Sequence, residues 1–180
     1  MDWFATSIGG AFIGSPFLAE DERGKFVKFY SSQSFFASGL PTNWNEDFYS
    51  SSRRGVIRGM HFQIPPHDHE KLVYCMHGKV LDVLLDLRKE SQTFGQYYAT
   101  ELDDVSCRCL FIPKGVAHGF LVLSEYVLMG YKLSAAYSAE HDKGIHWGSF
   151  GFEWGVVDPI LSPRDGALPT LADYASPFTS

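Results

Sequence analysis

The chain has 180 residues, of which 45% are hydrophobic and 16% aromatic, a composition that indicates one folded globular domain over residues 1–180. Its formal net charge is −6 without any run rich in Lys and Arg, which argues against non-specific nucleic-acid binding, because such binding needs clustered cations. No stretch reaches the ~18 apolar residues of a membrane span, and Cys75, Cys107 and Cys109 lack C-x-x-C spacing and indicate free thiols, so we expect a cytoplasmic protein.

Apolar segments of strand length, separated by Gly, Pro and Asp, dominate the chain, whereas helical periodicity is weak. We predict strands at residues 26–30, 55–63, 71–77, 79–87, 95–102, 107–112, 118–123 and 126–134. Short helices are predicted only around Thr6 and from Ala136 to Lys143. Many strands with few helices favour a sandwich or barrel. The last twenty residues, rich in Pro, Ser and Asp, are expected to wrap its outside within reach of a cavity.

Two neighbouring strands carry more specific predictions. The dipeptide His77-Gly78 between them predicts a hairpin turn. On the second strand, Asp82 and Asp86 alternate with leucine and valine, which predicts one packed face and one face that is wet or functional. Either carboxylate could form an ion pair with Arg58, which would otherwise suit a surface position.

An arginine, a histidine and a lysine occur inside apolar, strand-like segments. Arg58 and His61 share one segment, and Lys71 opens the next one, ten residues after His61. A charge in a buried strand is costly unless something compensates it, for example a bound anion. A bulge at Gly59 would direct both Arg58 and His61 to one face of the strand. The three side chains therefore predict an anion-recognition site beside a titratable base.

Only the later half of a cupin metal-binding pattern is present. Pro113–His118 fits P-x-G-x-x-H, but Lys71 occupies the position at which a glutamate would bind the metal. An ammonium group there opposes a divalent cation. A metal-dependent cupin enzyme could still use His67, His69 and His118, although H-x-H in a loop with two prolines is more typical of a solvated turn.

Taken in order, the motifs resemble the nucleotide-sugar 3,5-epimerases of the cupin superfamily, typified by dTDP-4-dehydrorhamnose 3,5-epimerase. The segments that carry the resemblance are Asp21–Phe26, Gly55–Gln63, Pro65-Pro66, Lys71–Val73, Gly78–Arg88, Thr93–Gly95, Ile112–Phe120, Tyr131-Lys132, Tyr137, Gly144-Ile145, Trp147, Trp154 and Ile160–Asp165. They span about residues 10–175 in the family's order and close to its spacing.

The resemblance implies a cupin-type double-stranded β-helix, an all-β jelly-roll barrel with a few short helices. It also implies an isomerase that inverts C3, C5 or both in a nucleoside-diphospho-4-keto-6-deoxy sugar, without a metal or cofactor, in a pathway to deoxysugars of surface polysaccharide or a glycosylated metabolite. The C4 ketone acidifies the hydrogens on both neighbouring carbons. Inversion then needs a base on one ring face, an acid on the other and a stabiliser of the enolate, and a positioned proton-transfer group typically contributes roughly 10²–10⁴-fold.

The resemblance also assigns roles to individual residues. His61 is the base, and Asp165 is the carboxylate that orients it. Lys71 lies beside the C4 oxygen, and Tyr131 donates a proton on the opposite ring face.

Further residues are implied to bind the substrate: Arg23, Phe26, Glu46, Arg58, Lys71, His118, Tyr137, Asp142 and Arg164. Tyr137 would stack on the nucleobase, and Asp82 would hold His118. Arg58 and Arg23 would contact the diphosphate, because a guanidinium suits phosphate oxygens. In this family the equivalent of Arg23 reaches in from the partner subunit of a homodimer.

Four positions depart from the family pattern. The usual Gln-Asp-Asn reads Glu46-Asp47-Phe48 here, which removes amide donors and introduces an aromatic ring. Lys28 stands where glutamate is usual, and Trp154-Gly155 replaces Trp-Pro. We expect these differences to affect recognition of the nucleotide and sugar, so that thymidine is not assumed, and to leave the base, acid and lysine untouched.

Two further functions fit parts of the same sequence. A 3,4-ketoisomerase of the same fold would move protons along one ring face and would not need Tyr131. A sugar-binding module without activity would need neither His61 nor Tyr131.

Overall fold

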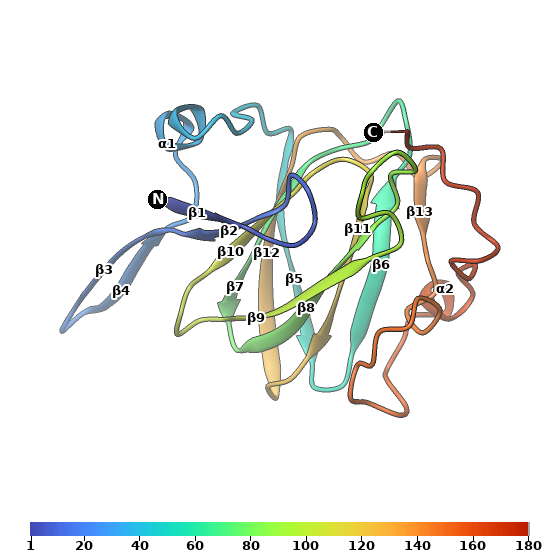
Figure 1. The fold of residues 1–180 in the computed structure, drawn as a ribbon. Coiled ribbons are helices and arrows are strands. Elements are labelled where there is room, and N and C mark those ends of the chain that lie inside the picture. Colours follow the sequence, from blue (N-terminus) through green and yellow to red (C-terminus); the bar gives the residue numbers. More distant parts are fainter. Residues whose placement is uncertain (180) are drawn as a thin grey trace.

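The computed structural model describes residues 1–179 and consists of two facing antiparallel sheets and a projecting hairpin (Figure 1). The elements are β1 Asp2–Ala5, β2 Phe12–Ser15, β3 Phe17–Asp21, β4 Gly24–Lys28, α1 Ser32–Ala37, β5 Glu46–Arg53, β6 Ile57–Gln63, β7 Lys71–His77, β8 Lys79–Asp86, β9 Tyr97–Asp103, β10 Cys109–Ile112, β11 Val116–Val122, β12 Tyr126–Leu133, β13 Asp142–Gly144 and α2 Pro163–Gly166. The sheets have the orders β1-β2-β10-β7-β12-β5 and β13-β6-β11-β8-β9, while β3 and β4 form a separate ribbon. The all-β jelly-roll prediction is confirmed.

Apolar side chains fill the space between the two sheets. Val73 of β7 and Leu110 of β10, from the six-stranded sheet, belong to one buried cluster with Leu84 of β8 and Phe120 of β11, from the five-stranded sheet. Each of these four side chains is at most 1% exposed. This cluster joins the two sheets beside the cavity described below.

The outer faces of both sheets are covered as well. Trp154 and Phe178 from the C-terminal segment pack with Leu85 outside the five-stranded sheet. Phe35 of α1 packs with Leu72 outside the six-stranded sheet. Strands that are buried on both faces read as nearly continuous apolar runs, as β7 and β8 do. The C-terminal segment wraps the outside of the barrel, as predicted.

β7 and β8 do not form the predicted hairpin. β7 pairs with β10 and β12, whereas β8 pairs with β11 and β9. The chain passes from one sheet to the other at Gly78, which has φ +83 and whose N–H donates to Asp104 at 2.9 Å. A tight-turn signal reports a local change of direction, but it does not report which strand lies beside each arm.

The predicted helix around Thr6 is a turn between β1 and β2. The Thr6 hydroxyl donates to the carbonyl of Ala11 at 3.1 Å and accepts from the N–H of Ile8 at 3.1 Å. A threonine side chain that bonds nearby backbone groups competes with helix formation.

The predicted helix from Ala136 to Lys143 is also absent, and a loop leads into β13 instead. The Gln63 side chain donates to the carbonyl of Ala136 at 3.2 Å and accepts from the N–H of Ser138 at 2.6 Å. These backbone groups therefore bond a distant side chain rather than one another. The strand β5 was not predicted either, because its Ser-rich sequence lacks an alternating apolar pattern.

Both faces of β8 are packed, so of the two alternatives predicted for its second face, wet or functional, the wet one is wrong. Asp82 and Asp86 are both 0% exposed. Asp86 pairs with Arg88 at 2.8 Å, and Asp82 pairs with His118 at 2.9 Å. Neither carboxylate is a partner of Arg58.

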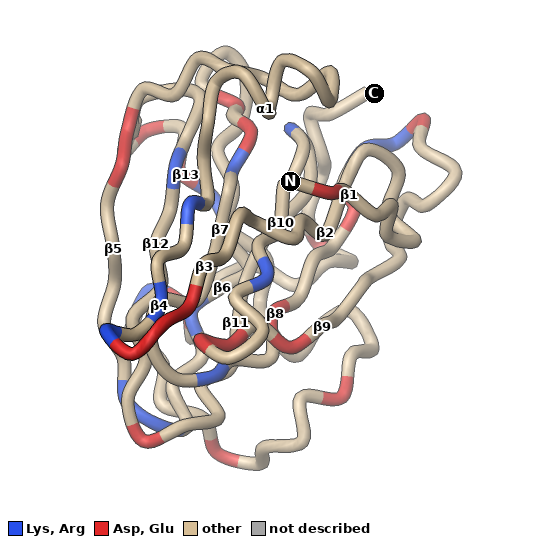
Figure 2. Tube along the Cα trace, turned by 90° about the vertical axis from the view of Figure 1, so that its left-hand side faces the viewer, with Lys and Arg blue, Asp and Glu red and all other residues tan. Residues whose placement is uncertain are grey.

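The charged residues of the described chain, residues 1–179, are interspersed along its trace, without a continuous basic stripe (Figure 2). Within the same residues, no helix is long and apolar enough to cross a membrane. The three cysteines are free and buried.

Candidate active site

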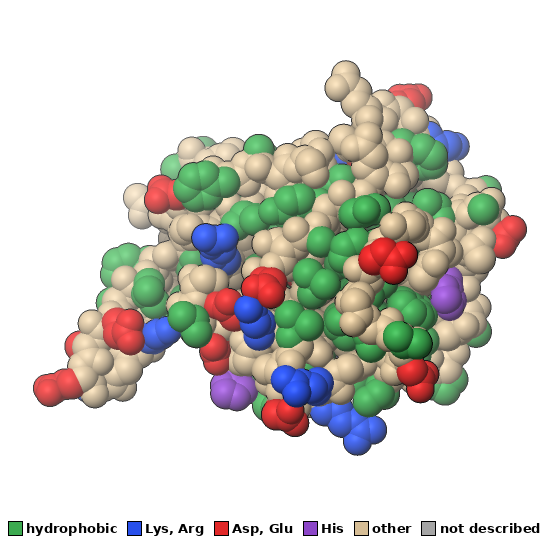
Figure 3. Space-filling model, turned by 60° about the horizontal axis from the view of Figure 1, so that its bottom comes forward, with side chains coloured by type: hydrophobic (Ala, Val, Ile, Leu, Met, Phe, Trp, Pro, Cys, Tyr) green, Lys and Arg blue, Asp and Glu red, His purple; other side chains and the backbone are tan. Residues whose placement is uncertain are grey.

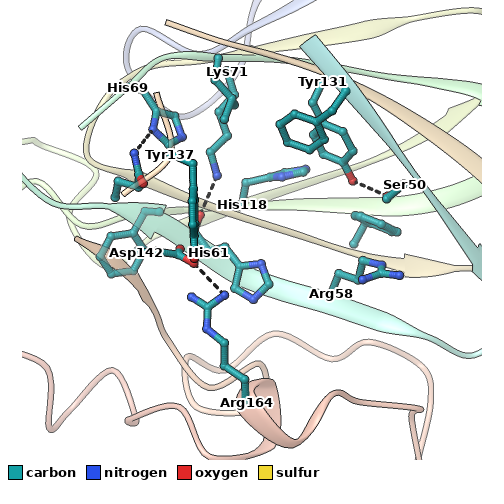
Figure 4. A pocket seen from close by; sticks show the side chains of 15 residues that line it. Ser50, Arg58, His61, His69, Lys71, His118, Tyr131, Tyr137, Asp142 and Arg164 are labelled. Carbon is teal, nitrogen blue, oxygen red and sulfur yellow. Dashed lines mark hydrogen bonds and ion pairs between the residues drawn. The ribbon is translucent and has the colours of Figure 1, made fainter. Parts of the chain in front are cut away.

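A cavity of about 240 Å³ lies between the two sheets and is lined by three of the four predicted catalytic residues, His61, Lys71 and Tyr131 (Figure 4). Its walls come from β5, β7 and β12 on one side, from β6 and β11 on the other, and from residues near β13 and α2. The lining residues are Phe48, Ser50, Arg58, His61, Phe62, Gln63, His69, Lys71, His118, Phe120, Tyr131, Leu133, Tyr137, Asp142 and Arg164.

Arg58 and His61 both reach the cavity because β6 contains a bulge. In its pairing with β11, His118 lies opposite His61 and Phe120 lies opposite Arg58, so β6 has one extra residue in this interval. Gly59 has φ +143, and a Cβ at this position would lie 2.5 Å from the backbone of β11. Only glycine fits such an approach, and the predicted bulge is confirmed.

His61 and Asp165 form a hydrogen-bonded pair, with 2.7 Å between Nε2 and Oδ1. Asp165 lies in α2, where the Ser162 hydroxyl accepts its backbone N–H. Burial alone raises the pKa of the Asp165 carboxyl, but bonds from His61 and from the Gly59 N–H bring that pKa below its usual value. The ionised carboxylate fixes the hydrogen on Nε2, which leaves the Nδ1 lone pair of His61 to accept a proton.

Tyr131 lies on the opposite wall from His61, because β12 and β6 belong to different sheets. The tyrosine is 8% exposed, and burial raises its pKa above the usual value, so the phenol keeps its proton. Its oxygen lies 3.1 Å from the Ser50 hydroxyl, and its ring stacks on Phe48 with centroids 4.9 Å apart. Phe48 thus contacts the predicted acid, which corrects the expectation that this departure leaves the acid untouched.

Lys71 is a buried cation at the start of β7. Its Nζ donates to the carbonyl of His61 at 2.9 Å. Burial lowers the pKa of Lys71 to about 8, although Asp142 and Asp82 oppose the shift. The side chain is therefore mainly an ammonium at neutral pH and can stabilise a negative oxygen in the cavity.

A second histidine–aspartate pair lies beside the first. His118 Nε2 is 2.9 Å from Asp82 Oδ2, which confirms that Asp82 holds His118. Burial raises the pKa of the Asp82 carboxyl, and His118 and Lys71 offset this only in part.

Three of the predicted substrate-binding residues line the cavity near its rim. Arg58 donates to the Ser52 hydroxyl at 2.9 Å and to the carbonyl of Ser51 at 3.1 Å. Arg164 forms an ion pair with Asp142 at 2.9 Å. Both guanidinium groups are thus held in place on the cavity wall.

Tyr137 lines the cavity and is 60% exposed, a position open to a stacked ring. Glu46 does not line the cavity, but its carboxylate accepts the backbone N–H of Tyr137 at 2.7 Å. Glu46 therefore holds the loop that carries Tyr137.

Arg23 and Phe26 lie away from the cavity within this chain. They belong to the β3–β4 hairpin, which projects from the body of the molecule (Figure 3). The Arg23 side chain is 87% exposed and pairs with Asp21 at 2.6 Å.

The histidines of the metal-dependent alternative do not form a ligand set. Among residues 1–179, no three His, Cys, Asp or Glu side chains come together in a way that could hold a metal ion. His67 packs against His141 with ring centroids 4.4 Å apart, whereas His118 is bonded to Asp82. His69 is 8% exposed and lines the cavity, so the interpretation of H-x-H as a solvated turn is wrong for His69.

Gln63 and Ser50 line the cavity without having been predicted as site residues, as do the apolar residues Phe62, Phe120 and Leu133. His69 was considered only as a metal ligand, and Phe48 only as a departure from the family pattern. One signal was available for His69. It precedes Lys71 by two residues, and side chains at that spacing on an extended segment point to the same side.

The arrangement suits proton transfer across a flat intermediate. One wall carries the His61 base, the other carries the protonated Tyr131 phenol, and the buried Lys71 ammonium lines the same cavity. A carbon acid placed between the walls could lose a proton to one side and gain one from the other.

Comparisons with known proteins agree with this geometry. The sequence profile described as dTDP-4-dehydrorhamnose 3,5-epimerase matches residues 5–173. The dTDP-4-dehydrorhamnose 3,5-epimerase of Shigella flexneri is 39% identical over 179 residues, which cover 97% of this chain and 99% of that protein. The protein of the same name from Methanothermobacter thermautotrophicus is 41% identical over 165 residues, or 89% of each chain. The crystal structure of dTDP-4-dehydrorhamnose 3,5-epimerase from Bacillus anthracis with TDP and PPi bound matches with a TM-score of 0.91 and 38% identity, covering 94% of this chain and 99% of that one.

Proposed function

Because this chain belongs to the dTDP-4-dehydrorhamnose 3,5-epimerase family and is a sugar-nucleotide epimerase of the isomerase class, we propose that His61, Lys71 and Tyr131 carry out its proton transfers. The substrate is a nucleoside-diphospho-4-keto-6-deoxy sugar, inverted at C3, C5 or both. The observation that carries the proposal is the placement of His61 and Tyr131 on opposing sheets of one cavity, with Lys71 lining the same space.

The reaction begins when Nδ1 of His61 removes the hydrogen from the carbon next to the C4 ketone. The Asp165 carboxylate, bonded to Nε2, stabilises the resulting imidazolium. Proton transfer from a positioned group contributes roughly 10²–10⁴-fold, or about 3–5 kcal/mol.

The negative charge then moves to the C4 oxygen, where the Lys71 ammonium stabilises the enolate. In a dry cavity such stabilisation is worth about 3–4 kcal/mol. The Tyr131 phenol donates a proton to the opposite face of the ring, which completes the inversion. Repetition at the second carbon acidified by the ketone requires that the ring turn or slide, that solvent takes the proton from the His61 imidazolium, and that solvent returns a proton to the Tyr131 phenolate.

The nucleotide end lies toward the cavity rim. Arg58 and Arg164 provide guanidinium groups for the diphosphate, Tyr137 provides an exposed ring for the base, and His118 and Asp142 complete the sugar pocket. Glu46 contributes by holding the Tyr137 loop.

The enzyme works as a cytoplasmic homodimer in which the β3–β4 hairpin of one subunit reaches the cavity of the other. Phe17 and Phe26 on this hairpin are 55% and 58% exposed in the single chain, and a partner would bury them. Arg23, at the tip, would then contact the partner's bound diphosphate.

Solvent-deuterium exchange tests the proposal. Purified enzyme in deuterium oxide, given thymidine, cytidine, uridine and guanosine diphospho-4-keto-6-deoxy sugars, should incorporate deuterium at C3 or C5 of at least one, as followed by proton NMR. Absence of exchange with every substrate would falsify the proposed function.

The variant Tyr131→Phe separates epimerisation from 3,4-ketoisomerisation. If Tyr131 is the acid, the variant should still exchange the hydrogen that His61 removes, while inversion falls by about 10²-fold or more. Full inversion by Tyr131→Phe would contradict the two-wall mechanism.

A further inference from the structure

One buried histidine of the cavity has no role in the reaction described above. His69 lines the cavity and is 8% exposed. Its Nδ1 lies 3.1 Å from Nε2 of Gln63, but its own Nε2 has no hydrogen-bond partner among residues 1–179. Buried polar atoms are rarely left unpaired, and those that are often mark a place completed by a ligand or water.

The hydrogen bonds of Gln63 determine which nitrogen of His69 carries the hydrogen. The Gln63 carbonyl oxygen accepts the N–H of Ser138 at 2.6 Å, and its amide nitrogen donates to the carbonyl of His67 at 2.9 Å. The same nitrogen also donates to the carbonyl of Ala136 at 3.2 Å, so its two hydrogens are shared among three acceptors. Because an amide nitrogen can only donate, Nδ1 of His69, at 3.1 Å, is the third acceptor. The hydrogen of the imidazole is therefore on the unpaired Nε2.

The ring is a neutral donor at physiological pH. Burial lowers the pKa of His69 to about 3, and the charge of Lys71 contributes to the shift. Nε2–H can thus bond an uncharged oxygen without competing with Lys71 for an anion.

The position of His69 indicates which oxygen it would meet. Residues 68–70 run without a turn into β7, so the side chains of His69 and Lys71 lie on the same side, and both are seen at the upper wall of the cavity (Figure 4). In the proposed function, Lys71 holds the C4 oxygen. The neighbouring hydroxyl of a 4-keto-6-deoxyhexose is the one on C3.

We propose that His69 is a specificity-determining residue whose Nε2–H donates a hydrogen bond to the C3 hydroxyl of the sugar. The inference rests on the proposed function, because Lys71 must mark the C4 oxygen. Inversion at C3 changes the direction of this hydroxyl relative to the ring, whereas inversion at C5 leaves it in place. This hydrogen bond should therefore affect the rate of inversion at C3 more than the rate of inversion at C5.

Two isosteric substitutions separate the two nitrogens of the ring. In His69→Gln, the amide nitrogen can take the place of Nε2 and keep the donor. In His69→Asn, the side-chain oxygen can take the place of Nδ1, keep the bond to Gln63 and lose the donor. We expect His69→Asn to weaken sugar-nucleotide binding by about tenfold and His69→Gln to retain most of it.

Binding is measured by calorimetry with two unreactive probes, nucleoside-diphospho-6-deoxyglucose and its 3,6-dideoxy counterpart, each with the nucleoside that gives the fastest exchange. Wild-type enzyme should lose about tenfold in affinity when the C3 hydroxyl is absent, whereas His69→Asn should lose nothing further. The affinity for the nucleoside diphosphate alone should be equal in both enzymes. In deuterium oxide, His69→Asn should also lower the ratio of C3 to C5 exchange.

Equal wild-type affinity for both probes would overturn the inference, even if no His69 variant folds. Additive losses from the substitution and from the missing hydroxyl would overturn it as well. If either result occurs while wild-type enzyme still exchanges the hydrogens at C3 and C5, the proposed role of His69 is wrong and the proposed function stands. If wild-type enzyme shows no exchange with any sugar nucleotide, the proposed function fails, and the role of His69 fails with it.

Discussion

The cavity contains two histidine–aspartate pairs of the same composition and different character. His61 of β6 and His118 of β11 are directly opposite each other in the pairing of these two neighbouring strands. The His61 side chain is 30% exposed and Asp165 5%, whereas His118 and Asp82 are 5% and 0% exposed. The pKa of Asp165 is below its usual value, while burial raises that of Asp82.

The difference shows how burial sets the role of a pair. Asp165 has enough compensating bonds to stay ionised and support a charged imidazolium on the accessible His61. Asp82 is so deeply buried that its charged form is disfavoured, which suits a pair whose role is to hold a side chain in place. One pair is suited to gain and lose protons, and the other to shape the cavity.

Substitution of the two histidines should give the strongest contrast in activity. His61→Ala should reduce deuterium exchange by at least about 10³-fold, because the base is lost, whereas His118→Ala should reduce it by about 10–100-fold through substrate positioning. Both variants are compared with wild type by NMR, and thermal denaturation checks that each is folded. Equal losses would show that the two pairs share the chemistry.

The two aspartates should differ in the same direction. Asp165→Asn removes the charge that supports the imidazolium and should lower kcat by about 10²–10³-fold with little change in melting temperature. Asp82→Ala leaves His118 buried without its hydrogen-bond partner and should destabilise the fold by about 1–3 kcal/mol. Chemical denaturation together with exchange rates measures both effects, and a stable Asp82→Ala enzyme would contradict the structural role of that pair.

The need for the Lys71 ammonium should make activity fall at alkaline pH. Its pKa is lowered to about 8, so the charged form is lost as pH rises through 8, and kcat/KM should fall about tenfold per pH unit above that value. Lys71→Arg, which stays charged, should have lower activity but no such fall. A wild-type profile that stays flat to about pH 9.5 would exclude Lys71 as the required cation.

Loss of the aromatic ring beside Tyr131 should change activity least. Phe48→Ala removes a stacked partner of Tyr131, a contact worth about 0.5–1.5 kcal/mol, and should lower the rate of inversion by about threefold to tenfold. Phe36→Ala is the matched control, because Phe36 lies on α1 and is 80% exposed. A Phe48→Ala enzyme that matches the control would show that the stack does not position the acid.

Much of the fold follows from local patterns. Residues 71–77 were predicted as the strand that β7 forms, and β8 and β12 lie within one residue of their predicted ranges, because alternation with a period of two is a local property. The bulge at Gly59 is predictable for the same reason, because a glycine beside charged residues in a strand-like segment can be recognised from the local sequence alone. The family resemblance paired His61 with Asp165 across a sequence separation of 104 residues, which no local pattern contains.

Local sequence patterns are sufficient to predict the strands β6 to β12 and the bulge, and the family resemblance over the whole chain supplies the reactive side chains. Three-dimensional packing alone places β7 and β8 in different sheets, stacks Phe48 on Tyr131, and buries His69 beside Lys71 instead of leaving it solvated. Strand partners and burial are not local properties, because they are set by closure of the two sheets on one another. That closure maximises apolar contact over the whole chain, so it cannot be predicted from any short segment of the sequence.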